Sequence, residues 1–141
     1  MSDPFDLERF VEAQNGVYPR VVEELRRGRK VTHWMWFIFP QLRGLGSSPM
    51  AERYGIGSRA EAEAYTRHPV LGPRLIECTS LTNAIQGRSA AEIFGSIDRP
   101  KFRSCVTLFA EVAANKAVFQ EALDKYFQGE RDTATLQRLR D

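Results

Sequence analysis

The residues best suited to chemistry gather between positions 33 and 41, in the run His-Trp-Met-Trp-Phe-Ile-Phe-Pro-Gln. His33 opens the run, and an imidazole titrates near neutral pH, which suits general acid–base catalysis. The indoles of Trp34 and Trp36 each carry one N–H donor that seeks a partner when buried, and Gln41 adds an amide. We therefore take His33 as the candidate catalytic residue. The candidate ligand-binding residues of this run are Trp34, Trp36 and Gln41.

A second group of polar residues lies on a helix predicted in the last third of the chain. Lys101, Ser104 and Thr107 recur every three positions, which places them on one helical face near its N-terminus. Backbone N–H groups and the helix dipole favour an anion there, and Arg103 adds positive charge. The candidate ligand-binding residues of this group are Lys101, Arg103 and Ser104. The alternative is that Lys101 pairs with Asp98 and that the hydroxyls bond to the helix backbone.

The two groups together would make a cleft with an aromatic wall and a cationic end. Such a cleft suits a nucleotide-like or phosphorylated small molecule, which the protein would bind and, in one version of the hypothesis, chemically alter. The sequence does not place the two groups side by side, so a second hypothesis stays open. In it the aromatic residues all belong to the core, and the protein is a non-enzymatic interaction module with an exposed apolar patch. We expect no cofactor and no metal, because phosphate loops, dinucleotide-binding glycines and zinc-ligand spacings are absent from the sequence.

The densest run of positive charge is Arg-Arg-Gly-Arg-Lys at 26–30. It follows a predicted helix, where basic side chains complement the C-terminal end of the dipole while remaining solvated. A phosphate site is the alternative, and nucleic-acid binding is a third functional hypothesis, which would need a continuous basic stripe. Because the net charge is only +2, we do not expect nucleic acid as a partner.

Caps and breakers divide the chain into the helices that must position these groups. Asp3-Pro4 opens the first helix, and capping boxes begin at Ser58 and Ser89. Asp132 can cap the last helix. The apolar run 34–39 lacks a decisive period, so strand and buried helix both remain open for it. We predict an all-α fold, a compact helical array of about seven or eight short amphipathic helices, in a single domain spanning 1-141.

Length and composition indicate a globular protein that needs no disulfides. Its 141 residues and 43% hydrophobic content are enough to bury one core. Cys78 and Cys105 lie in apolar helical patterns and are expected as buried free thiols. No apolar run approaches the roughly 20 residues that span a bilayer, and no secretion signal opens the chain. We expect a soluble cytoplasmic protein with no membrane partner, whose oligomeric state the sequence does not determine.

The run 33–41 also resembles a known family. Its residues, together with 5–10, 58–65, 68–75 and 98–109, are similar to those of a bacterial family catalogued as domain of unknown function 1810. The resemblance covers nearly the whole chain and implies an all-helical fold. Some members of that family carry the label calpastatin, which implies a long disordered inhibitor and does not suit this folded composition. The resemblance implies no catalytic residues.

Overall fold

The computed structural model describes residues 2–141, which form nine helices and no strand. The first five are α1 (Glu8–Gln14), α2 (Tyr18–Arg26), α3 (Met35–Ile38), α4 (Pro49–Tyr54) and α5 (Arg59–Arg67). The others are α6 (Leu71–Asn83), α7 (Ala90–Val112), α8 (Ala117–Phe127) and α9 (Thr133–Arg140). The all-α prediction is confirmed. The described residues hold nine helices rather than seven or eight, and one of the nine is the single turn α3 within the undecided apolar run.

Side-chain caps begin four of the helices, at Ser48, Ser58, Ser89 and Asp132. At Ser89 the capping box is complete, because Ser89 Oγ accepts from the Glu92 amide and the Glu92 carboxylate accepts from the Ser89 amide. These bonds satisfy N–H groups that have no partner inside the helix. Local sequence therefore fixes where these helices start.

Two residues with positive φ set helix boundaries, and at one of them the boundary differs from the expectation. Asp3 does accept hydrogen bonds from the Leu7 and Glu8 amides, but α1 begins only at Glu8 because Asp6 has a φ of 51°. In α7, Gly95 has a φ of 85° and divides the helix into two segments. The first segment begins at the expected capping box of Ser89, and the second carries Lys101, Ser104 and Thr107.

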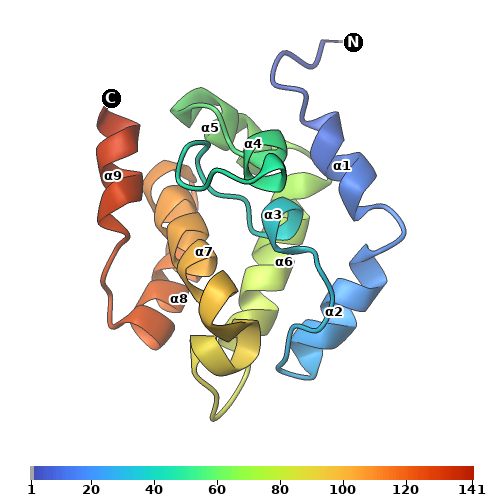
Figure 1. Cartoon of the computed structure of the whole chain (residues 1–141), viewed down its shortest axis with the longest axis vertical. Helices are drawn as coiled ribbons and strands as arrows, with labels where there is room; N and C mark the ends of the chain where they lie inside the picture. Colours follow the sequence, from blue (N-terminus) through green and yellow to red (C-terminus); the bar gives the residue numbers. More distant parts are fainter. Residues whose placement is uncertain (1) are drawn as a thin grey trace.

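Helices α6 and α7 run antiparallel through the middle of the molecule, with α1 and α2 on one side and α9 on the other (Figure 1). α6 packs against α2, α5 and α8, and α7 packs against α3, α5, α8 and α9. The ring of Phe39, just after α3, and rings from α7 form the centre of the core. Phe39 lies 5.0 Å from Phe102 and Phe102 lies 4.7 Å from Phe94, measured between ring centroids. The core therefore joins the 33–41 run to α7. Both cysteines are buried and free.

No helix in the described part of the chain combines the length and the apolar character that crossing a bilayer requires.

The joint between α5 and α6 depends on a glycine. Gly72 is buried in the first turn of α6, and a Cβ at this position would lie 2.3 Å from the Thr66 carbonyl oxygen. Because that oxygen belongs to the backbone, it cannot move aside as a flexible side chain would. α5 and α6 can approach this closely only with glycine at position 72.

We therefore predict that Gly72→Ala destabilises the fold by about 1–3 kcal/mol, although glycine-to-alanine changes inside a helix ordinarily stabilise it by about 1 kcal/mol. Urea unfolding followed by circular dichroism measures the difference. Ser80→Ala, on the exposed side of the same helix, is the matched control and is expected to change stability little. A Gly72→Ala protein as stable as wild type would contradict this account of the joint.

Candidate functional site

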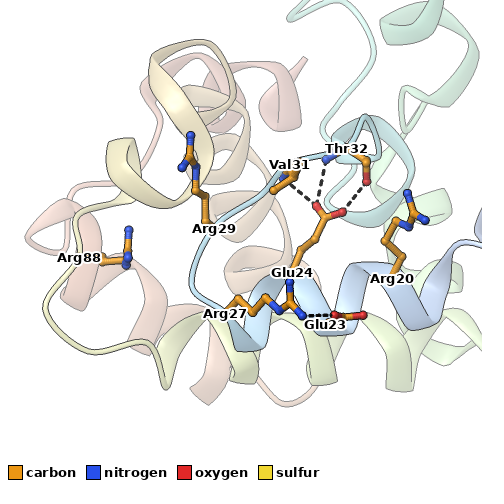
Figure 2. Close-up of a pocket in the computed structure, with 8 residues that line it drawn as sticks. All are labelled: Arg20, Glu23, Glu24, Arg27, Arg29, Val31, Thr32 and Arg88. Atoms are coloured by element: carbon orange, nitrogen blue, oxygen red, sulfur yellow. Dashed lines mark hydrogen bonds and ion pairs between the residues drawn. The ribbon is translucent and has the colours of Figure 1, made fainter.

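Glu24, a buried residue on α2, holds the loop that leads into the 33–41 run. One of its oxygens, Oε1, accepts from the Val31 amide at 2.7 Å, the Thr32 amide at 3.0 Å and the Trp34 indole at 2.9 Å. The other, Oε2, accepts from the Thr32 hydroxyl at 2.6 Å. Figure 2 shows the bonds from Val31 and Thr32 converging on this carboxylate. The loop is therefore folded back over the end of α2.

The charge on Glu24 is stabilised by these donors. Burial by itself raises the pKa of Glu24, but the bonds from Thr32, Val31 and Trp34 outweigh it and lower the pKa to about 2. The carboxylate is thus ionised at any physiological pH. Its four donors make it a fixed part of the scaffold.

Trp34 and Gln41 both lie in the interior. Trp34 is only 2% exposed, its N–H is used by Glu24, and the Lys30 ammonium lies 5.4 Å from its ring centroid. Gln41 is also buried, and its backbone carbonyl accepts from the Ile56 amide in a single bridge between two extended segments. Both residues thus contribute to the framework around the loop.

Trp36 and Lys101 come together, so the 33–41 and 101–107 stretches do meet in space. The Lys101 ammonium lies 4.8 Å from the Trp36 ring centroid, and it also pairs with Asp98 at 3.0 Å. Asp98 pairs in turn with Lys30 at 2.9 Å. The Trp36 indole nitrogen is buried and has no hydrogen-bond partner among the described residues. The ammonium of Lys101 is therefore shared between a carboxylate and an aromatic face.

The anion beside Ser104 is a side chain of the protein itself. Ser104 donates to the Asp132 carboxylate at 2.9 Å, and the Thr107 hydroxyl accepts from the Asp132 amide at 2.9 Å. Arg103 binds the backbone carbonyls of Glu130 and Arg131 at 3.0 and 3.1 Å. This face of α7 thus holds the segment that leads into α9, and the hydroxyls contact that segment rather than their own helix backbone.

His33 is exposed and lies beside a hollow of about 330 Å³. The other residues that line this hollow are Gly16, Val17, Arg20, Thr32, Trp34 and Phe37. None of Lys101, Arg103 and Ser104 is among them. His33 is therefore placed near the start of α2, whereas the cationic residues expected beside it line a different region.

A larger hollow of about 440 Å³ adjoins this one, because Arg20 and Thr32 line both. Its lining, drawn in Figure 2, consists of Arg20, Glu23, Glu24, Arg27, Arg29, Val31, Thr32 and Arg88. We call it the arginine hollow. Arg27 pairs with Glu23 at 2.6 Å. Within residues 2–141, the side chains of the other three arginines make no ion pair and no hydrogen bond; they are Arg20, Arg29 and Arg88.

Only part of this hollow was expected from the sequence, as the alternative phosphate site at 26–30. Arg27 and Arg29 belong to the basic run 26–30, whereas Arg88 lies in the connection between α6 and α7. Gly28 allows the two segments to meet, because a Cβ there would lie 3.3 Å from the Arg88 side chain. Arg20 stands two turns before Arg27 on α2, so helical spacing was the one available signal. Among the described residues no cluster of three imidazole, thiol or carboxylate groups is placed to hold a metal ion.

We predict that Glu24→Gln destabilises the fold by about 2–3 kcal/mol at neutral pH, because hydrogen bonds to an ionised partner are lost inside the protein. The loss depends on pH. Since the pKa of Glu24 is lowered to about 2 from an ordinary value of 4.5, its stabilising effect is complete above about pH 4.5 and disappears as the pH falls towards 2. The gap in unfolding free energy between wild type and variant should therefore narrow across that window.

Urea unfolding at a series of pH values measures the gap. Glu23→Gln, a neighbouring exposed carboxylate, is the control and should have little effect at any pH. A gap between wild type and Glu24→Gln that stays constant from pH 6 to pH 2.5 would rule out this role for the carboxylate.

Comparison with known proteins places the chain in a family. The model of the family described as "Protein of unknown function (DUF1810)" matches residues 4–139. A crystal structure of a conserved hypothetical protein from Mycobacterium tuberculosis is 58% identical, covers 99% of each chain and superimposes with a TM-score of 0.97. No curated protein matches the chain. The resemblance inferred from the 33–41 run is thus confirmed, and the chain belongs to the DUF1810 family.

Proposed function

We propose that this protein binds a phosphate-bearing small molecule in the groove formed by the arginine hollow and the adjoining hollow beside His33. The observation that carries the proposal is the set of three arginines without a carboxylate partner around one concavity: Arg20, Arg29 and Arg88. A guanidinium presents several N–H donors in a planar fork that matches a phosphate group. Four arginines against two glutamates leave the lining positively charged.

The floor of the groove is already organised before a ligand arrives. Glu24 fixes the backbone at Val31 and Thr32, so a ligand would not have to order this loop on binding. The negative charge of Glu24 is largely compensated by its four donors. Glu23 and Glu24 interrupt the basic surface, which favours a compact ligand over an extended nucleic-acid backbone.

The ligand would lie with its phosphate at the arginine hollow and its organic part towards His33. The two hollows share Arg20 and Thr32, so one molecule can occupy both. A nucleotide or sugar phosphate has this combination of charge and length. His33 is the side chain there that suits acid–base chemistry. The positive charges of this groove come from arginines of α2, of the loop after it and of the α6–α7 connection. The cleft expected from the sequence had Lys101 and Arg103 in this role.

A second candidate function is protein interaction. Val31 and Ile97 are 69% and 78% exposed, and the Lys30–Asp98 ion pair brings their segments together. Exposed aliphatic side chains on neighbouring segments are typical of a contact surface. This candidate predicts that substitution of Ile97, which does not line the arginine hollow, affects partner binding without affecting small-molecule binding.

The direct test is a thermal-shift and calorimetric titration with pyrophosphate, ADP, ADP-ribose, NAD and sugar phosphates. A ligand at about 100 times its Kd stabilises the fold by roughly 2.7 kcal/mol, which raises Tm by several degrees. We expect Arg29→Gln and Arg88→Gln to weaken binding at least tenfold each, because each loses a charge-assisted hydrogen bond of about 1.5–3 kcal/mol. Binding should also weaken with added salt.

Three further variants locate the ligand. Arg140→Gln, an exposed arginine at the end of α9, should bind as wild type does, and so should Lys101→Gln. His33→Ala should weaken binding of ADP more than that of pyrophosphate, which has no organic part to contact His33. The proposal fails if no phosphate compound raises Tm, or if Arg140→Gln lowers affinity as much as Arg29→Gln.

A further inference from the structure

A separate hollow of about 400 Å³ lies at the opposite end of α6 and α7 from the arginine hollow. The residues that line it come from α5, the start of α6 and the turn between α7 and α8, and they are Glu63, Thr66, Arg67, Gly72, Leu75, Ile76, Val112, Ala113, Ala114, Asn115 and Phe119. We call it the α5–α8 pocket. α6 has 13 residues and is therefore about 20 Å long, and no residue lines both hollows. The two can be tested independently.

The floor of the α5–α8 pocket is apolar. Leu75, Val112 and Phe119 are buried core residues whose surfaces line it, and Ile76 at the rim is 42% exposed. The close approach of Gly72 to the Thr66 carbonyl fixes one wall. A hollow of this volume with an apolar floor accommodates a ligand group of the size of a leucine or phenylalanine side chain.

Two unpaired charges of opposite sign flank this floor. Glu63 and Arg67 are one turn apart on α5 and both line the pocket. Neither side chain makes an ion pair or a hydrogen bond with another of residues 2–141. Glutamate and arginine at this spacing commonly pair with each other on a helix surface. Here both groups remain available to a ligand that carries one positive and one negative charge.

Helix ends of both signs border the pocket. α5 ends at Arg67 and α7 ends at Val112, whereas α6 and α8 begin beside it, at Leu71 and Ala117. The C-terminal ends are the ones that bear on a cation. Such ends carry partial negative charge and attract cations. Arg59 and Lys116 illustrate this, because each donates to the Glu111 carbonyl at 3.2 Å. An ammonium group that reaches these C-terminal ends would be stabilised in the same way.

We propose that the α5–α8 pocket binds a free α-amino acid with a large apolar side chain. The side chain would lie on Leu75, Val112 and Phe119. The ammonium would lie at Glu63 and the helix ends, and the carboxylate would pair with Arg67. This ligand class combines an apolar body with two adjacent opposite charges, as the lining does. The inference is independent of the phosphate site proposed for the arginine hollow.

Calorimetry and amide chemical-shift mapping with L-phenylalanine and L-leucine test the proposal. We expect saturable shifts confined to the end of α5, the start of α6 and residues 112–115. L-Phenylalaninamide, which lacks the carboxylate, and N-acetyl-L-phenylalanine, which lacks the ammonium, should each bind at least tenfold more weakly. Glu63→Gln should weaken binding of L-phenylalanine at least tenfold, and Arg67→Gln should do the same.

Matched controls separate the pocket from general charge effects. Glu12→Gln and Arg140→Gln remove exposed charges elsewhere and should leave the affinity unchanged. Ala114→Trp places a large side chain at an exposed position of the lining and should abolish binding while circular dichroism shows an intact fold. The proposal is overturned if neither amino acid binds, if the two neutralised analogues bind as tightly as L-phenylalanine, or if Glu63→Gln and Arg67→Gln bind as wild type does.

Discussion

The buried carboxylate of Glu24 is the interaction on which the geometry of this protein's candidate site depends. A buried ionised carboxylate would ordinarily be strongly destabilising, and it is tolerated here because four donors from one short loop converge on it. The same bonds decide the path of residues 31–34. They place Thr32 at the boundary of two hollows, direct the Trp34 indole inward and leave His33 exposed. One carboxylate thus fixes the path by which the chain enters the 33–41 run.

A second feature of the molecule is that its own carboxylates satisfy the polar face of α7. Asp98 forms ion pairs with Lys101 and Lys30, and Asp132 accepts a hydrogen bond from the Ser104 hydroxyl. The sequence pattern led us to expect an external anion here, and the structure shows internal carboxylates at these groups, including the Lys101–Asp98 pair that was the stated alternative. The three unpaired arginines of the arginine hollow differ from this face of α7. There the positive charge has no internal partner, which is the physical reason for proposing an external one.

The elements of the fold were predictable because their signals are local. Ser58, Ser89 and Asp132 mark helix starts through bonds to residues three positions later. The α3 turn was not predictable, since its residues are apolar throughout and lack a period. The site was only partly predictable because its partners are far apart in sequence. Arg88 and Arg29 line one hollow, and Ser104 meets Asp132 across 28 positions, but nothing near either residue in the sequence indicates its partner.

The antiparallel pair α6 and α7 separates two concave regions of opposite character. One end presents arginines over a fixed polar loop, and the other presents an apolar floor between Glu63 and Arg67. Because both helices are packed on several sides, the two regions are held apart by rigid elements. Ligands at the two ends would therefore bind without direct contact.

The measurement that tests the central claim most directly is a crystal structure with tungstate, an electron-rich oxyanion located by its anomalous scattering. The account predicts an ordered peak within hydrogen-bond distance of at least two of Arg20, Arg29 and Arg88, and its loss when pyrophosphate is added. An ordered peak at Lys101 and Arg103 instead, or no ordered peak at the arginine hollow, would contradict it.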